Sequence, residues 1–142
     1  MQAQAKRIAV FDMGGGTLDV SILCIEQGVI EVMATRGDTH LGGQDIDELL
    51  VKHCIADFKT KTNVDVTNNA RAKARLQNQV NHAKHQLSAT LSTVIDVESL
   101  SGDNDFSLNM NRAQFEELIA PILNRCLPPL TQALTDANLT KT

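Results

Sequence analysis

The 142-residue sequence contains no tryptophan and no tyrosine, and its aromatic residues are four phenylalanines. Proteins that bind single-stranded nucleic acid stack bases on aromatic side chains, so this composition gives that function little support. Basic residues are also in the minority, because 13 lysines and arginines stand against 17 aspartates and glutamates, for a formal net charge of −4. General binders of nucleic acid or of anionic membranes are basic. We therefore expect no nucleic acid and no membrane among the partners.

No apolar run approaches the length that crosses a bilayer, and no signal peptide is visible. The three cysteines, Cys24, Cys54 and Cys126, are far apart and form no CxxC pair, which argues against structural zinc. Each lies in an apolar segment, where a free buried thiol is the usual outcome. A reducing compartment fits best. We expect the cytoplasm, with the endoplasmic reticulum or an organellar lumen as open alternatives.

The most informative segment is DMGGGTLDV at positions 12–20. Short apolar runs flank it, and this pattern predicts a strand–turn–strand hairpin. Three consecutive glycines allow a sharp turn and a close approach to a ligand, and successive backbone N–H groups in such a turn can bind phosphate oxygens. The alternative is a glycine-rich hairpin without a ligand, because short glycine patterns recur by chance. The candidate phosphate-binding residues are Gly14, Gly15, Gly16 and Thr17.

Two carboxylates flank these glycines, and with the hydroxyl of Thr17 they are the candidate catalytic residues. Asp12 is placed to orient an attacking water or to hold a metal ion through water, and Asp19 to support the shell of that cation. Phosphoryl transfer depends on positioning and charge neutralisation more than on covalent steps. The chain has no GxxxxGK[ST] motif, so it is not a Walker-type NTPase. The alternative is that both carboxylates only cap the turn.

Hydrophobic spacing predicts a mixed α/β chain. Asp45, Asp47 and Glu48, in the first turn of the first helix, suit the positive end of the helix dipole. A bend or break is expected near position 128, because Pro128 and Pro129 interrupt the last helix. The predicted elements are three strands between 8 and 39, a helix from about 44, a polar loop at 60–69, a helix at 69–87, strands at 90–99 and 105–110, and a helix that begins after 111, with Asn111 as its N-cap.

A second candidate site lies on the helix predicted at 69–87. Its apolar residues from Leu76 to Leu87 mark a buried side, whereas four polar residues at i, i+3, i+4 and i+7 share another face. An amide, a cation, an imidazole and a hydroxyl there could bind ribose hydroxyls and lie against a purine. A solvated helix face is the alternative. The four residues are Asn81, Lys84, His85 and Ser88.

Four segments stand in order and at consistent spacing: IAVFDMGGGTLDVSI (8–22), EVMATRGDTHLGGQDID (31–47), HAKHQLS (82–88) and NRAQFEEL (111–118). Together they resemble the seventy-kilodalton heat-shock chaperones (the heat-shock protein 70 family). The resemblance implies an α/β chain with a partial actin-like ATPase, or ribonuclease H-like, fold that corresponds to lobe II of the nucleotide-binding domain. It implies ribonuclease-H-like strands with the phosphate loop at 1–39, a peripheral α+β subdomain at 40–111, and a helix at 112–142 that returns to the first subdomain.

The resemblance implies a parent chaperone that hydrolyses ATP to ADP with Mg²⁺, and with K⁺ as an optional cation, to control binding of unfolded polypeptides. It implies a nucleotide exchange factor on the 40–111 subdomain, and a J-domain co-chaperone and clients on other parts of the parent. Because lobe I is absent, we expect the chain alone to be inactive. An interaction lobe with weak or no nucleotide binding is the alternative. A sugar kinase or cytoskeletal ATPase would not explain GDTHLGGQDID or NRAQFEEL.

The sequence departs from the family at three positions. Asn81 stands where the family carries an acid that accepts from ribose, and its carbonyl oxygen can still accept. His85 replaces an arginine that stacks on adenine, and an imidazole supplies a cation only when protonated. We expect weaker or altered nucleotide affinity, and loss of hydrolysis does not follow. Gln44 also replaces an acid, without an interpretation from sequence.

Gly42 and Gly43 precede the helix that is predicted from about position 44. The resemblance places Gly43, after Gly42, near the nucleotide at a helix start, and an ordinary strand-to-helix turn is the alternative. His40 in the same turn is expected to be a structural, hydrogen-bonding residue. Because a later strand of the family's sheet is missing, the exposed edge is expected to allow self-association.

Overall fold

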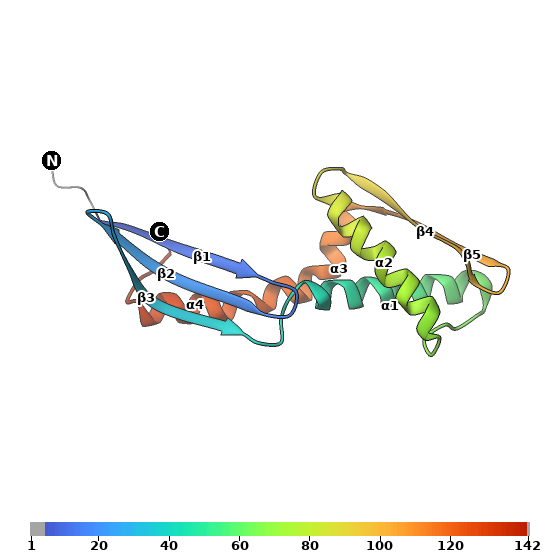
Figure 1. Cartoon of the computed structure of the whole chain (residues 1–142), viewed down its shortest axis with the longest axis horizontal. Coiled ribbons are helices and arrows are strands. Elements are labelled where there is room, and N and C mark those ends of the chain that lie inside the picture. The colour runs from blue at the N-terminus through green and yellow to red at the C-terminus, as the bar shows by residue number, and fades with distance from the viewer. Residues whose placement is uncertain (1–4, 142) are drawn as a thin grey trace. The chain divides into compact units, whose positions relative to one another are not determined.

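The computed structural model describes residues 5–141. Two compact units account for the chain: unit 1 consists of residues 1–44 and 121–142, and unit 2 of residues 45–120. Helices and strands occur in the mixed α/β pattern that the sequence predicts (Figure 1). The elements are β1 (Lys6–Met13), β2 (Leu18–Glu26), β3 (Val29–Asp38), α1 (Gly43–Thr62), α2 (Ala70–Leu87), β4 (Ser92–Ser101), β5 (Asn104–Asn111), α3 (Arg112–Arg125) and α4 (Leu127–Asp136).

Unit 1 is built on an antiparallel sheet in the order β1-β2-β3, which confirms the predicted meander. Alternate residues of β2, Leu18, Val20 and Ile22, are buried, as expected when one face of a strand packs on a core. Helix α4 packs on β2 and β3 (Figure 1). The turn from β2 to β3 has positive φ at both Gln27 (50°) and Gly28 (82°), which is the geometry that matches the twist of a two-residue hairpin.

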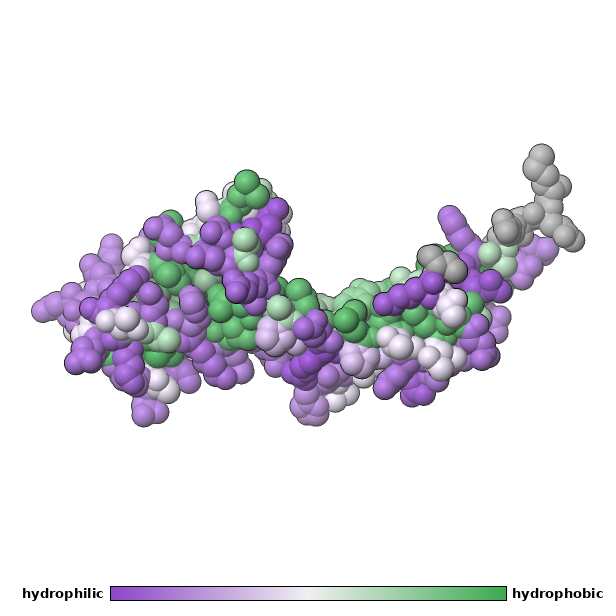
Figure 2. Space-filling model, turned by 180° about the vertical axis from the view of Figure 1, so that it is seen from behind, coloured by the Kyte–Doolittle hydropathy of each residue, from purple (hydrophilic) through white to green (hydrophobic). Residues whose placement is uncertain are grey.

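Strand β1 is an edge strand, and its apolar side chains are exposed on both faces. Ile8 is 37%, Val10 42% and Phe11 47% exposed, although alternate residues of a strand point to opposite faces. Figure 2 shows hydrophobic surface on the part of the molecule that carries this sheet. An uncovered apolar edge offers unpaired backbone groups to another chain.

We expect the chain to associate through β1. Replacing Val10 with lysine places a charge on the edge and is expected to shift the population toward monomer, since lysine blocks edge-to-edge pairing. The matched control is Val94→Lys on β4, where the valine is similarly exposed, at 47%. Sedimentation or light scattering over a concentration series measures the effect. A strictly monomeric wild type at high concentration would contradict this prediction.

Unit 2 packs α2 against the β4–β5 hairpin. The buried side of α2 is the predicted one, from Leu76 through Val80 to Leu87, and the rings of Phe58 and Phe106 meet edge to face with centroids 6.1 Å apart. Asparagine caps begin both α2 and α3, and the cap at Asn111 is the one that the sequence predicts. The side chain of Asn69 accepts from the N–H of Ala72, and that of Asn111 accepts from the N–H of Gln114, which in turn accepts from the N–H of Asn111.

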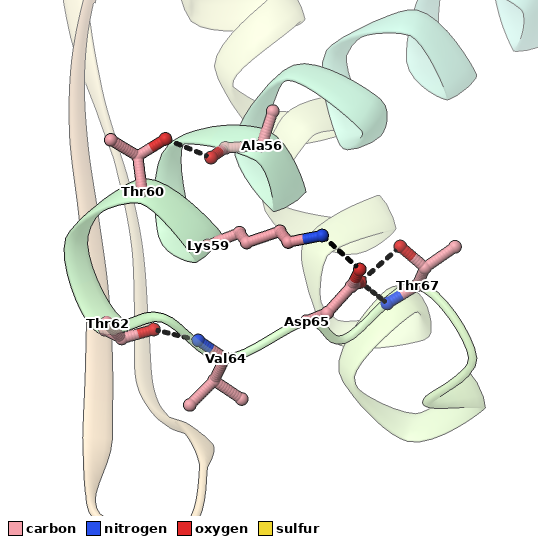
Figure 3. Close-up of polar contacts among 7 residues, drawn as sticks. All are labelled: Ala56, Lys59, Thr60, Thr62, Val64, Asp65 and Thr67. Atoms are coloured by element: carbon pink, nitrogen blue, oxygen red, sulfur yellow. Dashed lines mark hydrogen bonds and ion pairs between the residues drawn. The ribbon is translucent and has the colours of Figure 1, made fainter.

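The loop predicted at 60–69 begins later than expected, because α1 continues to Thr62. The hydroxyls of Thr60 and Thr62 donate to carbonyls four residues earlier, so residues that favour turns are satisfied inside the helix. Asp65, which follows the helix, accepts hydrogen bonds from Lys59 in the last turn of α1 and from Thr67 (Figure 3). The hydrogen bonds from Thr67, followed by that from Lys59, hold the pKa of Asp65 well below its usual range.

The break predicted near 128 lies at Cys126, between α3 and α4. Pro128 and Pro129 do not break a helix there, because they occupy the first turn of α4, where the missing N–H has no intrahelical partner to lose. Pro121 lies inside α3 without ending it. The expectation of three buried thiols is wrong for Cys24, which is only half-buried. Among residues 5–141, no helix is both long and apolar enough to span a membrane.

Candidate functional site

The glycine-rich segment of unit 1 forms the predicted hairpin turn between β1 and β2. Strand pairing runs to Met13 opposite Leu18, and the N–H of Gly14 then donates to the carbonyl of Thr17 at 2.9 Å. This bond closes the base of the turn and leaves Gly15 and Gly16 at its tip. All four residues from Gly14 to Thr17 are exposed.

The carbonyls of this turn bind the start of α1. The N–H of Gly43 donates to the carbonyl of Gly14 at 2.9 Å, and the N–H of Gln44 donates to the carbonyl of Gly15 at 2.8 Å. The first amides of a helix have no intrahelical acceptor, so the turn satisfies two of them. These two bonds fix the orientation of the turn. Because these two helix amides donate to carbonyls of the turn, they are not available to a ligand.

The amides of the turn, by contrast, point to no acceptor within the fold. Among the hydrogen bonds of residues 5–141, none has the N–H of Gly15, Gly16 or Thr17 as donor. Three successive exposed N–H groups on a turn whose carbonyls are held elsewhere are suited to bind an anion. The side-chain amide of Gln44 lies beside this tip. A Cβ added to Gly16 would be 3.7 Å from Oε1 of Gln44, and a Cβ added to Gly15 would be 3.9 Å from its Nε2.

Gly42 brings the strand-to-helix segment into direct backbone contact with the turn. A Cβ at this position would lie 2.4 Å from the carbonyl oxygen of Gly15 and 2.6 Å from the nitrogen of Gly16. Only glycine allows this approach. Gly42, which precedes α1, is therefore needed for packing against the turn, whereas Gly43, the first residue of α1, contributes its backbone N–H.

The two candidate carboxylates are directly opposite each other in the sheet. Asp12 pairs with Asp19, and Asp19 in turn pairs with Gly37 on β3. Opposite residues of an antiparallel pair share one face, and two like charges there are unfavourable. Both aspartates are exposed, so water screens the repulsion and a cation placed between them would relieve it. Gly37 leaves room beside Asp19, since a Cβ on it would be 3.0 Å from Oδ1 of that aspartate.

A hydrogen-bonded turn connects β3 to the glycine pair. Asp38 accepts from the N–H of His40 at 2.8 Å and from the guanidinium of Arg125 at 3.2 Å, and Arg125 also donates to the carbonyl of His40. The bond from the His40 amide, more than the one from Arg125, lowers the pKa of Asp38. The imidazole Nδ1 of His40 also forms a hydrogen bond with the hydroxyl of Thr39. This bond confirms the structural, hydrogen-bonding role expected for His40.

The second candidate site lies in unit 2, on α2. Lys84 and Asn81 both bond one carboxylate, that of Asp47 on α1: Nζ of Lys84 is 2.6 Å from Oδ1, and Nδ2 of Asn81 is 3.3 Å from Oδ2. The side chain of Asp47 is only 7% exposed. The first turn of α1 contains Asp45 and not Asp47, and Asp47 instead forms a largely buried ion pair with Lys84.

The other two members of the α2 face remain at the surface. His85 is exposed, and Ser88 is the C-cap of the helix, with its N–H directed to the carbonyls of Gln86 and His85. The predicted site residues thus fall into two sets: the turn and Gly43 are in unit 1, and the α2 face is in unit 2.

Sequence reasoning missed Asp47 and left Gln44 uninterpreted. A carboxylate early in a helix has a local explanation, so no nearby residue indicated that Asp47 pairs with α2. In the part of the chain that the structure describes, no group of three or more histidine, cysteine or acidic side chains is placed to hold a metal ion. A cation near Asp12 would therefore depend on water or on a ligand for most of its coordination.

Comparison with known proteins identifies the family. The family model described as "Hsp70 protein" matches residues 1–142. The heat shock 70 kDa protein of Neurospora crassa is 45% identical over 136 residues, which cover 96% of this chain and 21% of that protein. The heat shock cognate 70 kDa protein 3 of Dictyostelium discoideum is 44% identical, over 95% of this chain and 21% of that protein. A ribosome-associated molecular chaperone of Saccharomyces cerevisiae is also 44% identical, over 96% of this chain and 22% of that protein.

The chain therefore belongs to the Hsp70 family of heat-shock chaperones, and its mixed α/β fold is that of a partial actin-like ATPase lobe. It spans about a fifth of the length of the curated relatives that it matches.

Proposed function

We propose that this chain is lobe II of the ATPase domain of an Hsp70 chaperone. Its turn in unit 1 binds the phosphates of ATP or ADP, and the α2 face in unit 2 binds the nucleoside. The observation that carries the proposal is the set of three successive exposed amides, those of Gly15, Gly16 and Thr17, which the fold leaves without acceptors. Backbone amides bind phosphate oxygens without a side chain between them.

Each residue of the turn has a separate task in this proposal. The three amides bind the terminal phosphate oxygens, the hydroxyl of Thr17 adds a further donor, and Asp12 orients a water. Mg²⁺, when bound with the nucleotide, supplies positive charge that neutralises the phosphates, and Asp12 holds its hydration shell while Asp19 supports it. K⁺ is an optional second cation. The directly opposed pair of carboxylates favours a cation at this edge.

The charge on the α2 face suits the neutral part of the nucleotide. The cation of Lys84 is paired with the buried carboxylate of Asp47 at 2.6 Å, so the pair carries no net charge. Asn81 and Ser88 are neutral as well. Such a surface favours ribose hydroxyls and a base over phosphates, which need net positive charge or free amides. The chemistry of each candidate site thus suits a different part of a nucleotide.

The parent protein, in this proposal, hydrolyses ATP to control the binding of unfolded polypeptides, with a J-domain co-chaperone acting on it. We also propose a cytoplasmic location, which the ribosome association named for a yeast relative supports.

Titration of the ¹⁵N-labelled chain with Mg²⁺ and ADP, followed by NMR, tests the phosphate site. We expect shifts at the amides of Gly15, Gly16 and Thr17, and none at the turn glycines Gly28 and Gly102, which serve as internal controls. Thr17→Val is expected to weaken binding roughly tenfold, because a hydrogen bond to a charged group contributes about 1.5 kcal/mol or more. Thr35→Val, on β3, is the matched control.

Turnover of ATP by the same chain is expected to be negligible, since only one lobe is present. Unchanged turn amides at millimolar Mg²⁺ and ADP would overturn the phosphate site. Robust hydrolysis by the 142-residue chain would overturn the assignment of this lobe as half of the catalytic unit.

A second candidate function, docking of a nucleotide exchange factor on unit 2, has its own support. A groove of about 580 Å³ runs between α1 and α2 in this unit. Its floor is apolar, with Val51 and Ile55 from α1, and its rim carries charged and polar side chains from α2, including Lys73 and Gln77. Calorimetry with ADP and with an exchange factor separates the two functions, since an interaction lobe alone would bind the second and not the first.

A further inference from the structure

The environment of Asn81 points to a role for Asp47 that sequence reasoning did not find. We infer that Asp47 is a positioning residue, which holds the side-chain amide of Asn81 with its NH₂ group inward and thereby presents the carbonyl oxygen to a hydroxyl donor of the bound nucleoside. The inference rests on the proposed nucleotide function and names what determines specificity at the α2 face.

The carboxylate of Asp47 divides its two oxygens between two partners. Oδ1 accepts from Nζ of Lys84 at 2.6 Å and Oδ2 accepts from Nδ2 of Asn81 at 3.3 Å. Asp47 is 7% exposed at its side chain and Lys84 20%, so water competes weakly for these bonds. The carboxylate is therefore held in place by a cation on one side and directed at the amide on the other.

Hydrogen-bond chemistry allows the amide of Asn81 one orientation here. An ionised carboxylate only accepts, whereas an asparagine side chain has one donor end and one acceptor end. A flipped amide would place its carbonyl oxygen against Oδ2 of Asp47, which is two acceptors in contact. The NH₂ group must therefore face Asp47, and the carbonyl oxygen of the exposed Asn81 remains for a donor from outside.

This orientation lets a neutral amide serve as an acceptor on the ligand side, where an acid would otherwise be needed. Lys84 neutralises Asp47, so the whole group carries no net charge toward the ligand. Discrimination then depends on a hydroxyl that donates to Asn81, and a site built around such a bond disfavours an analogue that lacks the hydroxyl.

Replacing Asp47 with asparagine reverses the orientation. The new amide at position 47 has a single carbonyl oxygen, which the cation of Lys84 takes, because charge-assisted hydrogen bonds are the stronger ones. Its NH₂ group then faces Asn81, whose own carbonyl oxygen must turn inward to accept. The matched control is Glu48→Gln, the same change of charge at the next residue of α1, whose side chain is at the exposed surface.

The first experiment uses the ligand-free 142-residue chain. NMR of the side-chain amide of Asn81 is expected to show a large shift of its Nδ2 and NH₂ resonances in Asp47→Asn and no shift in Glu48→Gln. Unchanged resonances in Asp47→Asn would overturn the inference whether or not the chain binds nucleotide.

The second experiment compares ADP with 2′,3′-dideoxy-ADP by calorimetry. The wild type and Glu48→Gln are expected to bind ADP roughly tenfold more tightly than the dideoxy analogue, the effect of one hydrogen bond. In Asp47→Asn, and in Asn81→Ala at an exposed position that leaves the core intact, this ratio is expected to fall to near one. The ratio compares two ligands on one protein, so a general loss of stability does not move it.

Each result of the second experiment decides a separate question. A preference for ADP that persists in Asp47→Asn and Asn81→Ala overturns the inference and leaves the proposed function standing. Absence of binding by the wild type, for both ligands at millimolar concentration, refutes the proposed function and the inference with it. A ratio lost in both variants and kept in Glu48→Gln supports both.

Discussion

Replacing Gly42 with alanine is expected to lower the stability of unit 1 by about 3 kcal/mol, at the upper end for inserting one methyl group into a packed site. The added Cβ would lie 2.4 Å from the carbonyl oxygen of Gly15, 2.5 Å from its carbon, and 2.6 Å from the nitrogen of Gly16. All three are backbone atoms, so no flexible side chain can move aside. The clash must be relieved by displacing the turn or the start of α1.

Two substitutions in the same turn are the controls. Gly14→Ala brings its Cβ no closer than 3.6 Å to other atoms, and Gly16→Ala no closer than 3.7 Å, which is ordinary van der Waals contact. Urea unfolding of the three variants measures the difference. We expect Gly42→Ala to lower the free energy of unfolding several times more than either control. Equal effects at Gly42 and Gly14 would show that the close approach is absent in solution.

This prediction also bears on the phosphate site, because the turn is positioned by the segment that Gly42 brings against it. If the turn moves, its three amides lose their shared direction, and binding of a phosphate weakens even where the fold survives. Amide shifts in Gly42→Ala, measured with and without Mg²⁺ and ADP, report that loss separately from stability.

The features that the sequence predicts well are those with short-range causes. A run of three glycines between apolar segments forms a hairpin turn, and Asn111 caps the helix that follows it. Each depends on residues only a few positions apart. The polar face of α2 follows from helical periodicity alone, as does its buried side.

The features that the sequence does not predict depend on contacts between distant residues or on competing local rules. Asp47 lies 37 positions from Lys84, and nothing in the spacing of either helix indicates the pair. Thr60 and Thr62 are residues typical of loops, yet their hydroxyls bond to the helix that contains them. The sequence predicts that Pro128 interrupts a helix, yet Pro128 lies in the first turn of α4, where a proline is tolerated.

The ion pair of Asp47 with Lys84 is expected to show strong coupling in a double-mutant cycle. Lys84→Met removes the cation that pairs with Asp47 and leaves a carboxylate that is 7% exposed, with the neutral amide of Asn81 as its hydrogen-bond partner on α2. We expect the free energy of unfolding to fall by about 3 kcal/mol. Asp47→Leu is expected to cost less, since the long side chain of Lys84 is 20% exposed and can turn its ammonium group toward water. The double variant, with both charges removed, is expected to be more stable than Lys84→Met alone.

The control cycle uses an exposed pair of the same residue types in the same unit. Lys59 and Asp65 are 2.9 Å apart with side chains 58% and 46% exposed, so solvent screens their attraction and their coupling is expected to be much smaller than that of Asp47 with Lys84. Urea unfolding of all single and double variants yields both coupling energies. Equal coupling in the two pairs would contradict a buried role for Asp47. A large value for Asp47 and Lys84 alone would show that α1 holds the α2 face in place before any ligand arrives.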